Sequence, residues 1–203
     1  YGFRNPFRFD LALDQTGLFV GDVGWSSVEE LNFVAPGQNY GWPCWEGIEH
    51  QVAYQGFQAC QDFYAAGGDV KPLHTYTHPP GAAIVGGVQY SGINYPSSYQ
   101  GVYFFADYGR NEMFTLQVNS ENNLVPGSLS MFSQQTATPV HIFQGPDGDL
   151  YYISIFPGEL VRLHYTFENR APFAKITATP NGGGVPLTVQ FSSAGSSDPD
   201  GDI

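Results

Sequence analysis

An all-β fold is predicted for this 203-residue chain by its composition and by a strand pattern that recurs along it. Aromatic residues make up 16% of the chain, and 25 Gly and 15 Pro accompany them. This composition favours short strands joined by tight turns over long helices. Three segments, which begin at Gly17, Gly101 and Asp149, repeat one unit. In each unit a turn leads into an apolar strand, a polar loop and a second, alternating strand, which we interpret as an outer strand.

The spacing of these units is typical of the blades of a β-propeller. Gly101 and Asp149 are 48 positions apart, which falls within the usual range for blades. Gly17 and Gly101 are 84 positions apart, so either one blade is skipped or a long insertion intervenes. Residues 36–80 supply such an insertion, rich in Gly, Pro, Tyr and Gln and without a sustained period. We interpret them as an ordered surface excursion, which either borders a substrate pocket or is a packing loop.

Two further segments fit the same architecture. Residues 81–92 are small and apolar, and they include the Gly86-Gly87 pair. They predict a bent innermost strand, because blades crowd together near a propeller axis and leave room only for small residues. The sequence Pro146-Asp147-Gly148-Asp149 predicts a tight turn ahead of the last apolar strand.

The chain contains two cysteines, Cys44 and Cys60, which flank a polar loop. They are either two unrelated thiols or a disulfide. A disulfide across this loop would stabilise the fold by roughly 3 kcal/mol. It would also place the protein outside the cytoplasm.

The charge balance excludes some classes of partner. Seven Lys and Arg stand against 19 Asp and Glu, for a formal net charge of -12, so DNA, RNA and anionic membranes would be repelled. No apolar run approaches the roughly 20 residues of a membrane-spanning helix. The chain begins at Tyr1 within a motif and ends in what reads as the middle of a domain. We therefore interpret it as a piece of a longer protein.

Four short motifs follow one another within residues 2–47. They are Arg4-Asn5-Pro6, Gly21-Asp22-Val23-Gly24, Glu29-Glu30-Leu31-Asn32 and Asn39-Tyr40-Gly41-Trp42-Pro43. In these residues and in their order the stretch resembles the soluble quinoprotein glucose/sorbosone dehydrogenase family, and the resemblance continues weakly to about Tyr165. It implies the C-terminal blades of a six-bladed β-propeller that oxidises sugars with pyrroloquinoline quinone (PQQ) and calcium.

The resemblance implies that Arg4 and Asn5 contact PQQ over the propeller axis. PQQ carries three carboxylates and an ortho-quinone, and the planar guanidinium of Arg4 can pair with one of these groups. A structural arginine that bonds loop carbonyls is the alternative. Two residues after Asn5 this chain has Phe7, where sugar dehydrogenases of the family often carry Gln.

The resemblance also implies a calcium site at the backbone carbonyls of Gly24 and Trp25, and calcium accepts backbone oxygens readily. The family's general base is a His on an earlier blade, which would precede Tyr1. None of the five histidines of this chain matches that base. We therefore assign no catalytic residue here and expect this piece alone to be inactive.

Other titratable pairs are poor candidates for chemistry. Glu29 and Glu30 are neighbours on a predicted strand and point to opposite faces, which disfavours an acid/base pair. His74 and His78 are four residues apart but lie in a Pro-rich loop and not on a helix, which disfavours a metal pair. His141 lies between two aliphatic residues and is interpreted as a packed strand residue.

Three regions are expected along the chain. Residues 1–166 form the propeller blades, and 167–172 form a linker. Residues 173–203 resemble the start of a PKD domain, an immunoglobulin-like β-sandwich found on secreted and surface proteins. The resemblance rests on the order Asn-Arg-Ala-Pro, Pro-Leu-Thr-Val and Ser-Asp-Pro-Asp-Gly. Within this region, 173–178 and 187–191 alternate as strands around a Gly-rich turn.

The prediction is a piece of a secreted, periplasmic or cell-surface enzyme. The full-length protein would oxidise an aldose or polyol by hydride transfer to PQQ and pass the electrons to an external acceptor. The PKD-like region would contact a cell surface or a glycan. The rival is a non-catalytic cell-surface propeller that binds glycans or proteins, because one fold hosts many functions. A calcium-dependent lactonase would need a cluster of inward Asn, Asp and Glu ligands, which we do not find in the sequence.

Overall fold

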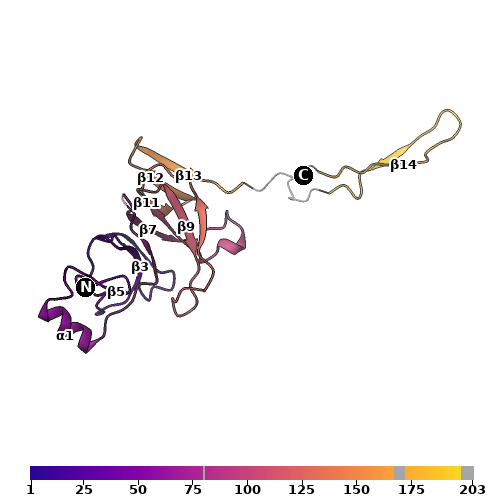
Figure 1. Ribbon diagram of the computed structural model, residues 1–203. Coiled ribbons are helices and arrows are strands. Elements are labelled where there is room, and N and C mark those ends of the chain that lie inside the picture. The colour runs from indigo at the N-terminus through magenta and orange to yellow at the C-terminus, as the bar shows by residue number, and fades with distance from the viewer. Residues whose placement is uncertain (80, 167–171, 198–203) are drawn as a thin grey trace. The chain divides into compact units, whose positions relative to one another are not determined.

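The computed structural model describes residues 1–79, 81–166 and 172–197 (Figure 1). The chain forms two compact units, Tyr1–His164 and Tyr165–Ile203, which are treated separately below. Strands dominate both units, and the one α-helix in the described residues is α1 (Gln58–Ala66). The predicted all-β class is therefore confirmed.

The first sheet contains four antiparallel strands in the order β1-β2-β3-β6. Between β3 and β6 lies an insertion that carries β4, β5 and α1. The large gap between the first two repeats is therefore an insertion and not a skipped blade. The strands are β1 (Pro6–Leu11), β2 (Leu18–Asp22), β3 (Val28–Val34), β4 (Trp45–Glu46), β5 (Glu49–His50) and β6 (His74–Thr77).

Two more sheets continue the same up-and-down order. The second has the order β10-β9-β8-β7 and the third β11-β12-β13. Figure 1 shows these sheets beside each other in unit 1 without closing into a ring. Their strands are β7 (Ile84–Gln89), β8 (Tyr103–Asp107), β9 (Glu112–Leu116), β10 (Ser130–Ser133), β11 (Pro139–Gln144), β12 (Leu150–Ser154) and β13 (Glu159–Leu163), with a short 3-10 helix at Ser97–Tyr99.

The first strands of the three sheets, β1, β7 and β11, lie next to one another. The predicted bend in β7 is present, because its pairing with β8 shifts register between Val85 and Val88, across the two glycines. The main core lies between the first two sheets and has no solvent access. It comprises Ala12, Phe19, Leu31, Ile84, Tyr103, Phe105 and Leu116.

Two details of the predicted repeat are wrong. The second strand of each unit was expected to be an outer strand, yet in the first two sheets a further strand pairs beyond it: β6 beyond β3 and β10 beyond β9. Residues 74–77 were counted as part of the surface excursion but form β6. A strand of only four residues that has no aliphatic residue carries little signal in the sequence.

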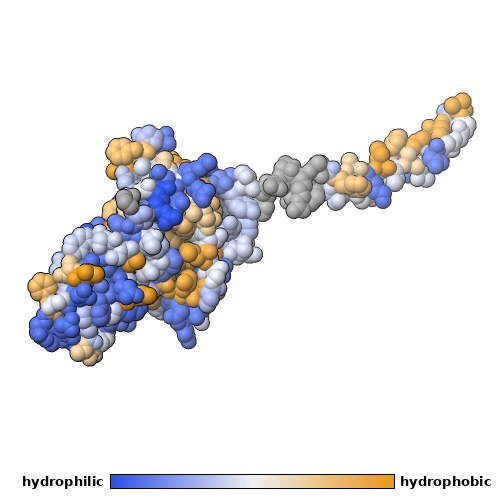
Figure 2. All heavy atoms as spheres, viewed as in Figure 1, coloured by the Kyte–Doolittle hydropathy of each residue, from blue (hydrophilic) through white to orange (hydrophobic). Residues whose placement is uncertain are grey.

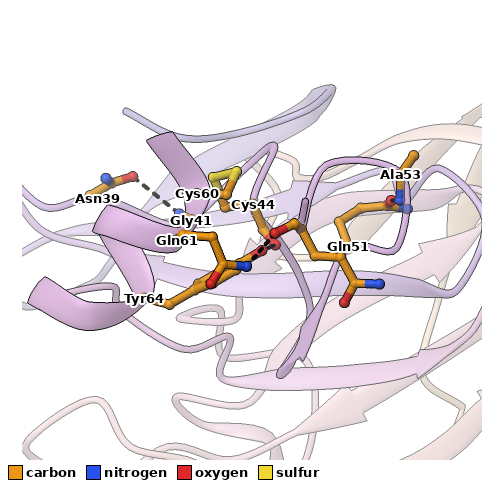
Figure 3. Close-up of a disulfide and its surroundings, with 9 residues drawn as sticks. Asn39, Gly41, Cys44, Gln51, Ala53, Cys60, Gln61 and Tyr64 are labelled. Carbon is orange, nitrogen blue, oxygen red and sulfur yellow. Dashed lines mark hydrogen bonds between the residues drawn. A yellow bond between two sulfur atoms is a disulfide. The ribbon is translucent and has the colours of Figure 1, made fainter. Parts of the chain in front are cut away.

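The excursion is closed by a disulfide between Cys44 and Cys60 (Figure 3), as one of the two alternatives predicted. The Tyr64 hydroxyl on α1 donates to the Cys44 carbonyl at 2.6 Å, and the backbone N–H of Gln51 donates to the same carbonyl at 2.8 Å. Helix and loop therefore converge on one residue, so this segment is an ordered part of the unit.

The second unit holds a two-stranded sheet of β14 (Thr177–Thr179) and β15 (Gln190–Ser192). Both strands fall within a few residues of the predicted ones. No residue in 172–197 is buried. The expected linker at 167–172 lies outside the described residues apart from Pro172, and so does the acidic end at 198–203. The PKD identity of this region stays a prediction.

The surface agrees with the acidic composition. Hydrophilic residues cover most of unit 1 on the face drawn in Figure 2, and hydrophobic residues form separate patches between them. Within the described part of the chain, the helices are too short or too polar to cross a bilayer.

Candidate functional site

The loop that carries Arg4 and Asn5 is fixed by a buried carboxylate on β2. The Asp22 side chain is only 4% exposed, and its two oxygens accept the backbone N–H groups of Arg4 at 3.0 Å and Asn5 at 2.7 Å. Val23 N–H donates back to the Asn5 carbonyl at 3.0 Å. Burial raises the pKa of Asp22, while these two N–H groups and the Arg4 charge oppose the shift. The start of β1 is thus attached to the end of β2.

The side chains of this loop remain accessible. One terminal nitrogen of Arg4 donates to the Val23 carbonyl at 3.0 Å, and the guanidinium carbon lies 5.8 Å from the Trp42 ring centre. Asn5 lines a mainly apolar cavity of about 260 Å³ where the first strands of the three sheets meet. Other residues on its wall are Phe7, Val23, Val85, Tyr108 and Val140. We call this space the axial cavity.

The turn that carries Gly24 and Trp25 is organised by Glu46, which is 3% exposed. A single carboxylate oxygen of Glu46 accepts four consecutive backbone N–H groups, at 2.8 to 3.4 Å. They belong to Trp25, Ser26, Ser27 and Val28. Although burial opposes ionisation, these donors and the Gln51 amide lower the pKa of Glu46 to about 2.

The backbone at Gly24 tolerates no side chain, because an added Cβ would overlap the Val28 carbonyl. The N–H groups of the turn point at Glu46, and within the described part of the chain no donor contacts the carbonyls of Gly24 or Trp25. Two unpaired carbonyls in one turn fit the donor set that calcium uses. No group of three or more Asp, Glu, His or Cys suited to a metal occurs among the described residues.

Aromatic rings flank this turn. Trp25, Trp42 and Tyr54 form a triangle with ring centres 5.6 to 5.8 Å apart, and Trp25 is 43% exposed. Trp42 and Tyr54 both come from the excursion, so the excursion lies against the predicted calcium turn. Exposed rings of this kind can stack on an apolar face of a ligand. Both predicted roles for the excursion, as the border of a substrate pocket or as a packing loop, stay predictions.

The structure brings the predicted residues together in part. Arg4 bonds the Val23 carbonyl, next to Gly24 in the chain, so loop and turn are neighbours. Asp22, Glu46 and Tyr54 were not predicted as site residues. Asp22 was visible within the Gly-Asp-Val-Gly motif, but its role as an anchor depends on a loop 17 residues earlier. Nothing in the local sequence of Glu46 or Tyr54 indicates their contacts with residues 25–28 and 42.

The buried acids of β3 have separate partners, as expected from their alternation. Glu29 bonds the His78 ring and accepts the Ile84 N–H at 2.8 Å. Glu30 accepts the Gly47 N–H at 2.6 Å and the Asn32 amide at 3.2 Å, and burial raises its pKa to about 7.

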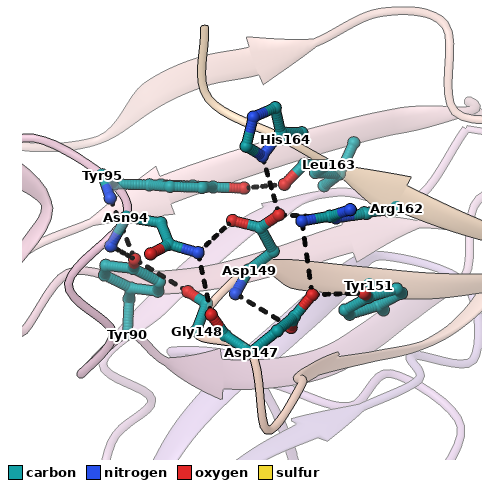
Figure 4. Close-up of polar contacts among 10 residues, drawn as sticks. All are labelled: Tyr90, Asn94, Tyr95, Asp147, Gly148, Asp149, Tyr151, Arg162, Leu163 and His164. Atoms are coloured by element: carbon teal, nitrogen blue, oxygen red, sulfur yellow. Dashed lines mark hydrogen bonds and ion pairs between the residues drawn. The ribbon is translucent and has the colours of Figure 1, made fainter.

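Three other histidines stack on aromatic rings or bond to a buried carboxylate. His74 stacks near Tyr76, and burial lowers its pKa. His164 bonds the buried Asp149 carboxylate at 2.8 Å, beside Arg162 at 2.6 Å (Figure 4). His141 stacks on Phe143 in β11, as expected for a packed strand residue.

Comparisons with known proteins agree with this architecture. The Glucose / Sorbosone dehydrogenase family model matches residues 1–162. The HIPL2 protein of Arabidopsis thaliana is 28% identical over 155 residues, which are 72% of this chain and 22% of that protein. The chain therefore spans less than a quarter of that relative.

Solved structures share the fold. The apo-form of the soluble aldose sugar dehydrogenase from Escherichia coli matches with a TM-score of 0.60 and 24% identity, over 80% of this chain and 45% of that one. The PQQ-bound form of an aldose sugar dehydrogenase from Streptomyces coelicolor gives a TM-score of 0.55 and 19% identity, over 76% and 38% of the two chains. At these identities the likeness concerns the fold alone.

Proposed function

Because this chain belongs to the glucose/sorbosone dehydrogenase family, we propose that the full-length protein is a PQQ- and calcium-dependent dehydrogenase of an aldose or polyol. One observation carries the proposal. The Arg4–Asn5 loop and the Gly24–Trp25 turn are held side by side through Asp22 and the Val23 carbonyl, with guanidinium donors on one and unpaired carbonyls on the other. This is a donor set for an anionic cofactor and for a hard cation.

Each part of the site has a distinct task. PQQ, when bound, supplies the quinone that takes up hydride from the sugar. Arg4 would bind a carboxylate or quinone oxygen, and Asn5 would donate or accept a hydrogen bond beside it. The carbonyls of Gly24 and Trp25 would bind calcium, while Glu46 fixes the turn from the opposite side. The exposed ring of Trp25 and the half-buried ring of Tyr54 would exclude water and pack on the sugar.

The general base and the remaining blades lie upstream of Tyr1 in this proposal. An external acceptor takes the electrons from the reduced cofactor. The disulfide supports a secreted, periplasmic or cell-surface location, because such bonds persist in oxidising compartments. Residues 173–203 would begin a PKD module that contacts a cell surface or a glycan.

The test is reconstitution of the full-length protein with PQQ and calcium, followed by dye reduction with a panel of aldoses and polyols. We expect a sugar-dependent rate that EDTA abolishes and calcium restores. Arg4→Gln should lower the rate at least tenfold, whereas Lys175→Gln in the second unit should not change it. If no sugar gives a rate with the loaded protein, the dehydrogenase proposal is wrong and a non-catalytic binder is favoured.

A further inference from the structure

Arg8 has an unusual backbone conformation for an arginine in a strand. Its φ is +66°, in the left-handed region that bulky residues avoid. The pairing of β1 with β2 shifts register between Pro6 and Phe9, so Arg8 lies in a β-bulge. Bulges redirect a side chain and recur next to functional sites, where strained residues also gather.

Neighbouring strands are shaped to accept this bulge. A Cβ at Gly86 in β7 would overlap the Arg8 carbonyl. A Cβ at Gly21 in β2 would lie 3.2 Å from the Phe7 carbonyl and 2.7 Å from the Gly86 nitrogen. The bulge therefore depends on glycines in two other strands, which makes it a property of the packed sheets and not of a frayed edge.

The bulge directs the Arg8 side chain across β7 to the third sheet. Its Nε donates to the Val140 carbonyl in β11 at 2.8 Å, and its guanidinium carbon lies 5.0 Å from the Phe7 ring centre. Phe7 and Val140 both line the axial cavity. Arg8 itself does not line the cavity but bonds a residue of its wall, and its two terminal nitrogens have no hydrogen-bond partner within the described residues.

Arg8 differs from other cations of unit 1 in its partners. Arg110 pairs with Glu112 at 2.6 Å and Arg162 with Asp149 at 2.6 Å, and Lys71 pairs with Asp69 at 2.7 Å. The side chains of Arg8 and Arg4 instead donate to backbone carbonyls, although the Arg4 charge also acts on the Asp22 carboxylate. In a chain of net charge -12, an arginine without a carboxylate partner within the described residues, bonded to a wall residue of the axial cavity, leaves that place available to an external anion.

Burial and the Arg8 charge together lower the pKa of His141, the residue after Val140, so its ring lies within the electrostatic reach of Arg8. The buried Nδ1 atom of His141 has no hydrogen-bond partner in the described part of the chain.

We propose that Arg8 is a second cationic contact in the axial cavity, which with Arg4 and Asn5 holds a planar ligand that carries more than one carboxylate. The apolar wall suits the flat body of such a ligand, and the two guanidinium groups, each bonded to the carbonyl of a wall residue, suit its carboxylates. The inference rests on the proposed function, in which that ligand is PQQ. It assigns to Arg8 a role beyond that of the Arg4–Asn5 pair.

The experiment is a titration of the calcium-loaded full-length protein with PQQ, followed by tryptophan fluorescence and by equilibrium dialysis. Arg8→Gly removes the side chain but keeps the backbone, because glycine adopts a positive φ freely. We expect its thermal midpoint to equal or exceed that of the wild type, while the Kd for PQQ rises at least tenfold. Arg8→Lys should recover part of the affinity, and Lys175→Gln should bind as the wild type does.

Salt dependence provides a second readout. Removal of a cation from the site should reduce the slope of log Kd against log salt concentration in Arg8→Gly relative to the wild type. If the wild type binds PQQ and Arg8→Gly binds it equally well with the same slope, the role of Arg8 is refuted and the proposed function stands. If the wild type does not bind PQQ at all, both proposals fail.

Discussion

Glu46 and Glu30 show how the number of hydrogen-bond donors decides the pKa of a buried carboxylate. Both are almost fully buried, at 3% and 7% exposure. Glu46 accepts four backbone N–H groups and a side-chain amide, whereas Glu30 accepts one backbone N–H and the Asn32 amide. Their pKa values consequently move in opposite directions, to about 2 for Glu46 and about 7 for Glu30.

The substitution Glu46→Gln should destabilise the fold by about 2 kcal/mol at pH 7, since charge-assisted hydrogen bonds to four amides become neutral ones. The folded pKa lies below the ordinary value of 4.5, so the stabilisation is present above pH 4.5 and is lost as the pH falls toward 2. Urea unfolding at several pH values should therefore show a difference in unfolding free energy between wild type and variant, and this difference should shrink as the pH falls from 4.5 toward 2.

Glu49→Gln is the matched control for this change, because Glu49 is an exposed carboxylate in the neighbouring strand β5. It should leave the unfolding midpoint within experimental error. If the difference in unfolding free energy between wild type and Glu46→Gln stayed constant from pH 7 to pH 3, the assignment of an ionised, N–H-bound carboxylate would be contradicted.

At the scale of elements, the turn after β2 is defined as much by the insertion as by its own residues. Gly24 and Trp25 adopt their backbone because Glu46, at the end of β4, binds the N–H groups that follow them. The disulfide and α1 close the insertion around Cys44, two residues before Glu46. A long insertion thus supports the predicted calcium turn.

Gly24→Ala should destabilise the protein by about 2 kcal/mol or more, because its Cβ would overlap the Val28 carbonyl and the backbone would have to move. In the full-length protein, calcium binding should weaken with it, which isothermal titration calorimetry can measure. Gly56→Ala is the control, since an added Cβ there meets no atom within 4 Å. If the two variants were equally stable, the turn would accommodate the added Cβ and the prediction would be wrong.

At the scale of the whole unit, buried acids join neighbouring sheets of residues 1–164. Glu29 of β3 accepts the Ile84 N–H of β7, and Asp107 of β8 accepts the Tyr76 hydroxyl of β6 at 2.7 Å. Asp149 accepts the Asn94 amide from the second sheet's loop at 2.8 Å (Figure 4). All three carboxylates have no solvent access. Part of the acidic composition therefore serves internal structure.

Asp149→Asn should destabilise the unit by about 3 kcal/mol at neutral pH, because Arg162 and His164 lose their anionic partner and the link to Asn94 is disturbed. Although burial opposes ionisation, hydrogen bonds from Asn94, His164 and Arg162 lower the pKa of Asp149 to about 2, so this stabilisation is complete above pH 4 and disappears toward pH 2. Thermal unfolding of wild type and variant at pH 7 and pH 3 tests the prediction. If Asp149→Asn lowered the thermal midpoint by the same amount at both pH values, the prediction would be contradicted.

Sequence patterns predicted the strands well where apolar residues recur and less well where they do not. β2, β8 and β12 are short apolar runs and were predicted at their observed places. β6 was missed because it is only four residues long and contains no aliphatic residue. The bend in β7 followed from two adjacent glycines. The bulge at Arg8 could not be predicted, because it depends on glycines in two other strands.

Local residue types and their spacing were enough to predict the all-β class and the family resemblance in four ordered motifs, and that resemblance marks Arg4, Asn5, Gly24 and Trp25. The carboxylates that anchor the loop and the turn, and the bond from Arg8 to Val140 on the wall of the axial cavity, follow only from the packing of the sheets. Such contacts join residues up to 132 positions apart, and the free energy of burying and pairing them depends on neighbours that no local pattern encodes.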